Sequence, residues 1–180
     1  MVVRRVGEAE RGEDTMVTRM LLLADTHVPK RAKRLPEAVL RAVDEADIVV
    51  HAGDWVDETT LDLLASKARM LQGVFGNNDG DELRARLPEI ARFAVEAVDV
   101  AVVHETGPSR QRESRMDEAF PDVDLLVFGH SHIPWDTVSP AGMRLLNPGS
   151  PTDRRRQPAR TMMWAEIDGA AVKATLVTLP

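Results

Sequence analysis

The sequence has no cysteine among its 180 residues. It therefore contains no disulfide framework, no thiolate zinc site and no cysteine nucleophile, and its composition fits a reducing compartment. Any metal ion would have to be held by His, Asp, Glu or Asn side chains.

Long hydrophobic runs and an excess of positive charge are also missing. No apolar stretch approaches the roughly 20 residues that a membrane-spanning helix needs, and the N-terminal segment has no hydrophobic region of the signal-peptide type. A formal net charge of −6 argues against a dedicated nucleic-acid binder, because such proteins neutralise phosphates with a basic surface. We therefore expect a cytoplasmic protein that does not contact membranes and for which nucleic acid is a disfavoured partner.

The chain divides into an extension and one domain. Residues 1–17 are charged and lack apolar periodicity, so we expect a flexible extension there. Residues 18–180 contain no repeat, low-complexity tract or linker-like segment, which predicts a single domain. A domain near this size buries roughly 68–70% of its unfolded surface, so its core needs neither a metal nor a disulfide to form.

Five short apolar runs, each typical of a buried strand, end in clusters of Asp, Asn or His, mostly beside glycine. They occupy residues 20–27, 47–54, 69–79, 100–105 and 125–132. Helical spacing of apolar residues in 35–46 and 57–68 separates the first three runs, which predicts a βαβαβ unit with parallel strands. Because the carboxyl ends of parallel strands share one edge of a sheet, the polar clusters should converge there.

The side chains expected to converge are oxygen and imidazole ligands without sulfur. They are Asp25, His27, Asp54, Asn77, His104, His130 and His132. This mixture suits Mn²⁺, Fe or Zn²⁺ better than Ca²⁺ or a structural zinc. The set is too large for one tetrahedral ion, but it forms two four-ligand shells if Asp54 bridges two ions, an arrangement used for in-line displacement at phosphorus. Two divalent ions would carry more positive charge than the two carboxylates neutralise, so we expect the site to bind an anionic phosphate ester.

The order of these polar clusters resembles that of the metal-binding motifs in the calcineurin-like metallophosphoesterases. The motifs are DTH, HAGDW, GNND, the histidine at position 104 and GHSH. Two further segments resemble the small single-domain phosphodiesterase branch. One is NPGSP at 147–151, and the other is a hairpin at 161–179 with Asp168-Gly169 as its expected turn. The resemblance implies an α/β fold in which two mixed β-sheets pack as a sandwich flanked by α-helices. It also implies a metal-dependent phosphodiesterase in which a hydroxide bridging two metal ions attacks phosphorus in line.

The resemblance further assigns the ligands. One ion would be held by Asp25, His27, Asp54 and His132, and the other by Asp54, Asn77, His104 and His130. The ions would be divalent transition metals, with manganese expected first and iron, zinc or nickel as alternatives.

Two positions depart from the family pattern. Many members have a histidine that contacts phosphate and protonates the leaving group, whereas this chain has Asn78, so that catalytic role is weakened or vacant. His104 is followed by Glu105 and Thr106 instead of the glycine that this branch often has, which changes the surroundings of the second ion.

Two other functions stay open on the same fold. A retromer subunit that resembles it works through protein contacts without catalysis, but such relatives tend to lose metal ligands, and here every ligand position is filled. A DNA nuclease is disfavoured by the acidic charge and by a chain too short for an added capping domain. We expect a small phosphate ester as substrate, and a homo-oligomer is one option for the assembly.

His51 and two basic segments lie outside the implied ligand set. His51 precedes Asp54 on a predicted strand, and we favour a structural role for it. The segments at 29–34 and 154–156 are interpreted as solvated faces. The alternative is a basic rim beside the site, because the first follows a ligand motif and the second follows NPGSP.

Overall fold

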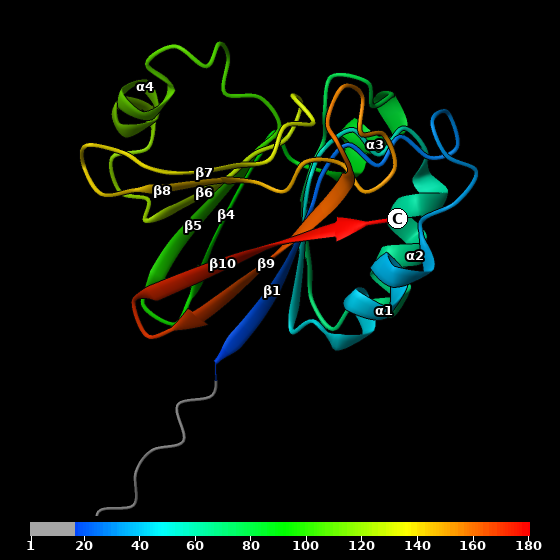
Figure 1. Cartoon of the computed structure of the whole chain (residues 1–180), viewed down its shortest axis with the longest axis horizontal. Coiled ribbons are helices and arrows are strands. Elements are labelled where there is room, and N and C mark those ends of the chain that lie inside the picture. Colours follow the sequence, from blue (N-terminus) through cyan, green and yellow to red (C-terminus); the bar gives the residue numbers. More distant parts are fainter. Residues whose placement is uncertain (1–16) are drawn as a thin grey trace, which may run out of the picture.

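The computed structural model describes residues 17–180. The predicted extension therefore lies, except for Val17, outside the described residues. The expected sandwich of two mixed sheets flanked by helices is confirmed (Figure 1). Sheet A has the order β10-β9-β1-β2-β3, with β1 (Thr18–Leu23), β2 (Ile48–Ala52), β3 (Leu71–Val74), β9 (Arg160–Asp168) and β10 (Ala171–Leu179). Sheet B has the order β4-β5-β6-β8-β7, with β4 (Ile90–Val95), β5 (Val98–Val103), β6 (Leu125–Val127), β7 (Trp135–Val138) and β8 (Arg144–Asn147). The helices are α1 (Glu37–Glu45), α2 (Glu58–Lys67), α3 (Asp81–Arg86) and α4 (Arg112–Ala119).

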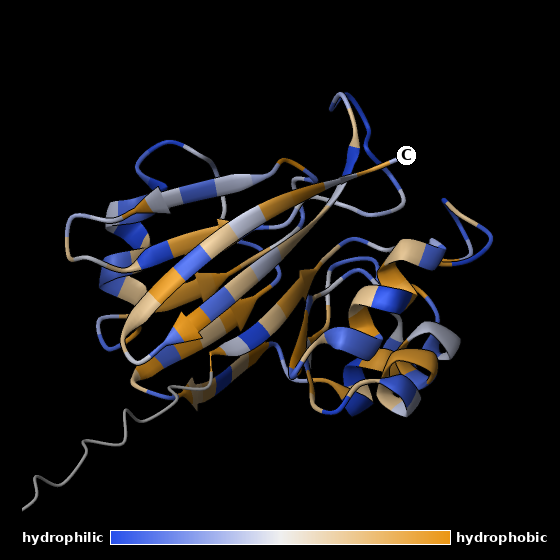
Figure 2. Cartoon of the chain, turned by 60° about the horizontal axis from the view of Figure 1, so that its bottom comes forward, coloured by the Kyte–Doolittle hydropathy of each residue, from blue (hydrophilic) through white to orange (hydrophobic). Residues whose placement is uncertain are grey.

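Three apolar clusters hold these layers together. Alternate residues of β1 show the arrangement, because Met20 and Leu22 pack between the two sheets while Leu21 and Leu23 pack against the α1 and α2 side. A third cluster joins the other face of sheet B to Phe120, at the end of α4. The strands are accordingly mostly hydrophobic, whereas the helices carry both hydrophilic and hydrophobic residues (Figure 2). Burial on both faces explains why β1, β2, β5 and β6 appear in the sequence as continuous apolar runs.

The predicted βαβαβ unit is confirmed, since β1 pairs with β2 and β2 with β3 in parallel. The C-terminal hairpin is also present, but its turn is shifted by one residue from the prediction. Asp168 pairs with Ala171, so the two residues between the strands are Gly169 and Ala170, not Asp168 and Gly169. Gly169 has a φ of 58°, a conformation that glycine adopts without steric cost.

The end of the sandwich away from the carboxyl ends of the parallel strands has a polar contact of its own. Glu96, in the turn between β4 and β5, accepts hydrogen bonds from the hydroxyl of Thr18 (2.8 Å) and from the backbone of Gly169. The N–H of Ala97 also donates to the carbonyl of Gly169 (3.2 Å). Sheet B is thereby tied to two segments of sheet A at this end. Within residues 17–180, no helix is both long and apolar enough to cross a membrane.

Candidate metal centre

The seven predicted ligands come together where five parallel strands of the two sheets end. Asp25 and His27 follow β1, Asp54 follows β2, Asn77 follows β3, His104 follows β5, and His130 and His132 follow β6. All but Asn77 and His130 are buried. Sheet A thus contributes both carboxylates, and sheet B contributes three of the four imidazoles.

One group of ligand atoms surrounds the Nε2 atoms of His27 and His132, which lie 3.2 Å apart. Asp25 Oδ1 is 3.4 Å from His132 Nε2, and Asp54 Oδ2 is 3.4 Å from His27 Nε2. Two ligand atoms that each lie about 2.0–2.2 Å from one ion at a tetrahedral or octahedral angle are roughly 3.0–3.5 Å apart. The spacing of these atoms therefore fits a shared cation.

A second group lies on the other side of Asp54. Its Oδ1 atom is 3.3 Å from His104 Nε2, and Asn77 Oδ1 is 3.0 Å from both His104 Nε2 and His130 Nδ1. Asp54 thus contributes one oxygen to each group, which is one of the ways in which a carboxylate bridges two ions. Asp25 also lies within reach of this second group, because ligand atoms of Asp25, Asp54 and His104 all lie within 4.8 Å of one another.

Backbone carbonyls orient two of the imidazoles. The carbonyl of Ala52 lies 2.7 Å from His104 Nδ1, and the carbonyl of Asp153 lies 2.7 Å from His132 Nδ1. A carbonyl only accepts, so each Nδ1 carries the proton, and the lone pair of each Nε2 points into the cluster. Such hydrogen bonds are the usual means of fixing a metal-binding histidine.

Burial sets the charge state of two of the imidazoles. It lowers the pKa of His27 and brings that of His132 to about 4, so both rings are neutral near pH 7 and able to bind a metal. Burial alone would raise the pKa of Asp54, but the neighbouring His104 ring and the hydrogen bonds from Asn78 outweigh it and hold the pKa well below its usual range.

Asp25 has a buried carboxylate oxygen that forms no hydrogen bond with the described residues. Burial raises its pKa to about 8, and its Oδ2 atom is buried without a hydrogen-bond partner among the described residues. A buried, unpartnered carboxylate oxygen is costly in a folded protein. A cation among the ligands would supply the missing partner, so the residues present fit a metal ion.

Asn78 lies against the bridging carboxylate. Its backbone N–H donates to Asp54 Oδ1 (2.9 Å), and its side-chain Nδ2 donates to Asp54 Oδ2 (2.6 Å). The residue that replaces the family histidine therefore orients Asp54, and it offers an amide at the exposed side of the site.

Two side chains, Asp79 and Ser150, position the ligand loops in a way that the sequence motifs do not reveal. Asp79 is buried and accepts from the backbone N–H groups of Asp54, Val56 and Gly76 at 3.0, 2.7 and 2.7 Å. It thereby joins the loops after β2 and β3. From the NPGSP segment, the Ser150 hydroxyl donates to the carbonyl of Asp25 at 2.7 Å. No residue pattern marks such contacts, because they join side chains to the backbone of distant segments.

His51 lies behind the cluster and not in it. It is fully buried, its ring stacks on Trp55 with centroids 3.6 Å apart, and its Nε2 atom is 3.1 Å from the Thr26 hydroxyl. This placement agrees with the structural role favoured from the sequence.

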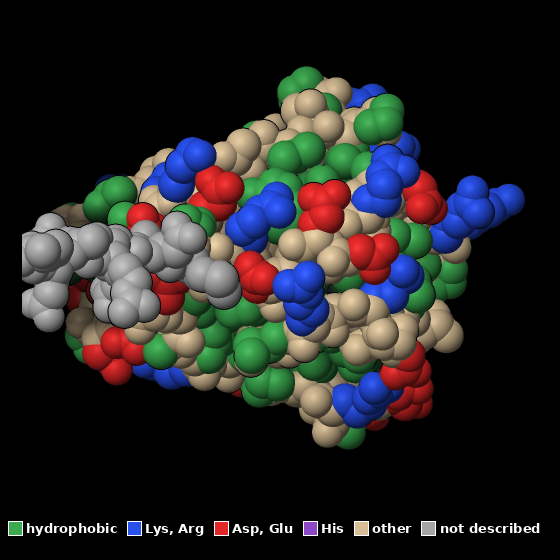
Figure 3. Space-filling model, turned by 90° about the horizontal axis from the view of Figure 1, so that it is seen from below, with side chains coloured by type: hydrophobic (Ala, Val, Ile, Leu, Met, Phe, Trp, Pro, Cys, Tyr) green, Lys and Arg blue, Asp and Glu red, His purple; other side chains and the backbone are tan. Residues whose placement is uncertain are grey.

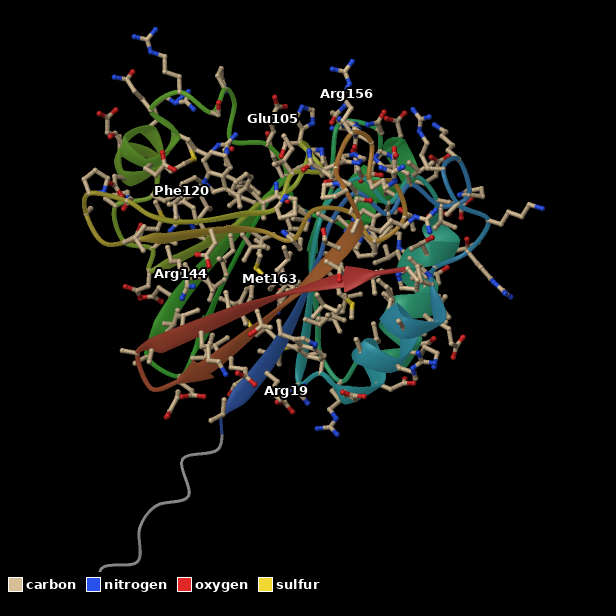
Figure 4. All side chains as sticks on the ribbon, viewed as in Figure 1. Arg19, Glu105, Phe120, Arg144, Arg156 and Met163 are labelled. Atoms are coloured by element: carbon tan, nitrogen blue, oxygen red, sulfur yellow. The ribbon has the colours of Figure 1, made fainter. Side chains whose placement is uncertain are left out.

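The two basic segments meet beside the first ligand group. Arg31 donates from its backbone to the carbonyl of His27 (2.8 Å), and its Nε atom lies 3.6 Å from Asp153 Oδ2. Arg154, Arg155 and Arg156 follow Asp153 directly and are exposed. Figure 4 shows Arg156 and Glu105 at the same upper edge of the molecule. The segments thus form a basic rim, the alternative interpretation.

Comparisons with known proteins agree with this geometry. The calcineurin-like phosphoesterase superfamily domain matches residues 19–170. A "probable metallophosphoesterase" of Methanothermobacter thermautotrophicus is 35% identical over 159 residues, which are 87% of this chain and 90% of that protein. The solution structure of protein TM1076 of Thermotoga maritima is 35% identical, with a TM-score of 0.73, and covers 91% of this chain and 100% of its own. Vps29 of Entamoeba histolytica, solved in complex with zinc, shares the fold at 24% identity, with a TM-score of 0.72 and 89% and 99% of the two chains covered. The chain therefore belongs to the calcineurin-like phosphoesterase superfamily.

Proposed function

We propose that this protein is a metal-dependent phosphodiesterase with a two-metal site. The observation that carries the proposal is the arrangement of imidazole nitrogens and buried carboxylate oxygens from both sheets, with neighbouring ligand atoms 3.2–3.4 Å apart and Asp54 between His27 and His104. The first ion would be held by Asp25, His27, Asp54 and His132, and the second by Asp54, Asn77, His104 and His130. Divalent transition metals, manganese first among them, would supply Lewis-acid stabilisation of the phosphoryl oxygens and lower the pKa of the attacking water.

The surrounding residues are suited to an anionic substrate. Two divalent ions carry more charge than Asp25 and Asp54 neutralise, and the exposed arginines beside His27 and His132 add positive charge at the rim. Such a local field raises the concentration of a phosphate ester at the site even though the chain as a whole is acidic. On the described part of the face in Figure 3, by contrast, basic and acidic side chains are interspersed. A small ester in the cytoplasm is therefore our proposed substrate, and nucleic acid is a weaker candidate.

A screen of metals against substrates tests this function. The metal-free protein would be supplied in turn with Mn²⁺, Fe²⁺, Zn²⁺, Ni²⁺ or Ca²⁺ and assayed on aryl diesters, monoesters, nucleotides and single-stranded DNA. We expect transition-metal-dependent turnover that is fastest on diesters. The absence of turnover under every condition would favour a noncatalytic scaffold, and preferred cleavage of DNA would favour a nuclease.

Gly76 should control metal affinity without being a ligand. A Cβ atom there would collide with the backbone nitrogen and Oδ1 of Asp54. We expect Gly76→Ala to displace Asp54 and weaken Mn²⁺ binding, measured by isothermal titration calorimetry, by about 10–100-fold, as for residues that orient ligands. Gly80→Ala is the matched control, because the nearest atom to its Cβ is the flexible end of Glu82 at 3.3 Å. Equal affinities in the two variants would contradict the predicted role of Gly76.

A further inference from the structure

A cavity of about 350 Å³ opens beside the second ligand group and shares Asn77 and His104 with it. Its other walls come from Phe75 after β3, Ile90 on β4, and Met116 and Phe120 at α4. This volume lies at the lower end of the range for small-molecule sites, which are mostly apolar with a few polar groups. A group attached to a phosphorus atom at the metal centre would therefore have next to it a space whose wall combines apolar side chains with polar ones.

Charges in the cavity wall indicate what kind of group fits. The Arg84 guanidinium is held in the wall by the carbonyls of Asp79 (2.9 Å) and Gly76 (3.0 Å), and it stacks on Phe75 at 4.4 Å. Glu89 and Glu105 also line the cavity, and Glu105 lies 3.7 Å from His130. The two carboxylates outnumber the one guanidinium and so disfavour a second anionic group on this side, whereas the basic rim lies beside the other ligand group, at His27 and His132. The side of the site at His27 and His132 therefore favours anionic groups, whereas the side at the cavity favours uncharged ones.

We propose that this cavity is a specificity subsite for an uncharged, ring-sized apolar group on the phosphorus of the substrate. The proposal rests on the proposed function, because the phosphoryl group must lie at the metal centre for its substituent to reach the cavity. In Figure 4, Glu105 and Phe120, both of which line the cavity, lie on the side of the molecule that holds α4. The preferred substrates would thus be phosphoesters with an aromatic or similarly compact ring.

Phenylphosphonate and methylphosphonate provide the test, because they carry the same phosphonate and differ only in the organic group. We expect the Mn²⁺-loaded protein to bind phenylphosphonate about tenfold more tightly in calorimetric titrations, from the apolar surface that the ring buries. The 4-nitrophenyl esters of the two phosphonates, which share a leaving group, should show the same preference in kcat/KM.

Ile90 offers a variant that changes the wall without touching the ligands, since its side chain is partly exposed. Ile90→Asn should reduce the preference for phenyl about threefold and leave methylphosphonate binding unchanged. Val138→Asn, at an exposed strand position outside this cavity, is the matched control and should change neither value. Equal binding of the two phosphonates by the unaltered protein, or an unchanged preference in Ile90→Asn, would overturn the subsite alone. Failure to bind either phosphonate, together with no turnover of any ester, would overturn the proposed function as well.

Discussion

Asp54→Asn is expected to reduce phosphodiester hydrolysis by at least about a thousandfold while the protein stays folded. Asp54 contributes one oxygen to each ligand group, so the substitution removes an anionic ligand from both proposed ions. Lewis-acid stabilisation by a bound ion is worth several kcal/mol, and about 1.4 kcal/mol corresponds to a factor of ten in rate. The apolar clusters that hold the sheets do not depend on this carboxylate. Steady-state kinetics and circular dichroism measure the two parts of the prediction.

His51→Ala is the control variant for Asp54→Asn. His51 lies on β2, which Asp54 follows, and is equally buried, but it contacts Thr26 and Trp55 and is not among the proposed ligands. Its loss should lower stability and reduce activity far less than the change at Asp54. Similar losses of activity in the two folded variants would show that the roles of Asp54 and His51 are misassigned.

The second large effect is expected at Asn78. A positioned general acid typically contributes about 10²–10⁴-fold, mostly when the leaving oxygen is strongly basic, and an amide gives up no proton at neutral pH. The unaltered protein should therefore hydrolyse aryl diesters far faster than alkyl diesters, with a steep dependence on the pKa of the leaving group. Asn78→His should accelerate alkyl substrates selectively and flatten that dependence, measured as kcat/KM over a series of leaving groups.

Asn78→Gln controls for this change because it keeps the amide and alters only its reach. The contacts of Asn78 with Asp54 make the control necessary, since any substitution there also disturbs the bridging carboxylate. A steep dependence should persist in Asn78→Gln. A shallow dependence in the unaltered protein, under conditions where chemistry limits the rate, would mean that another group supplies the proton.

The sequence indicates the elements that bury long apolar runs and says little about the rest. β1, β2, β5 and β6 were predicted because both faces of these strands are covered and their apolar runs are continuous, whereas the edge strand β3, LQGV, was predicted from the polar cluster that follows it. Helix α4 was not, since its eight residues RESRMDEA are largely polar. β4 was missed as well, because Arg92 interrupts its apolar residues and no polar ligand cluster follows it.

Some features of the candidate site could likewise be predicted from the sequence, and others could not. The ligand side chains stand at strand ends, where chain order and parallel pairing are enough to predict that they converge. The contacts of Asp79 and Ser150 were beyond prediction because they depend on which backbone groups the folded loops bring within reach. The cavity was equally hidden, since its walls come from β4, α4 and the loop after β3.

The polar contacts of Glu96 join the two sheets at one end of the sandwich, and the ligand cluster lies at the other end. Glu96 ties sheet B to β1 and to the β9–β10 turn. In the proposed holoprotein, ions held by Asp25 and Asp54 of one sheet and by His104 and His132 of the other would cross-link the layers at the opposite edge. Loss of the ions would leave the ligand end with only the direct contacts between the sheets, such as His104 Nδ1 to the carbonyl of Ala52 and the N–H of His130 to Asp25, whereas the Glu96 end would be unchanged. Amides at the carboxyl ends of β5 and β6 would exchange with solvent sooner than those near Glu96, so metal occupancy would set how often the sandwich opens.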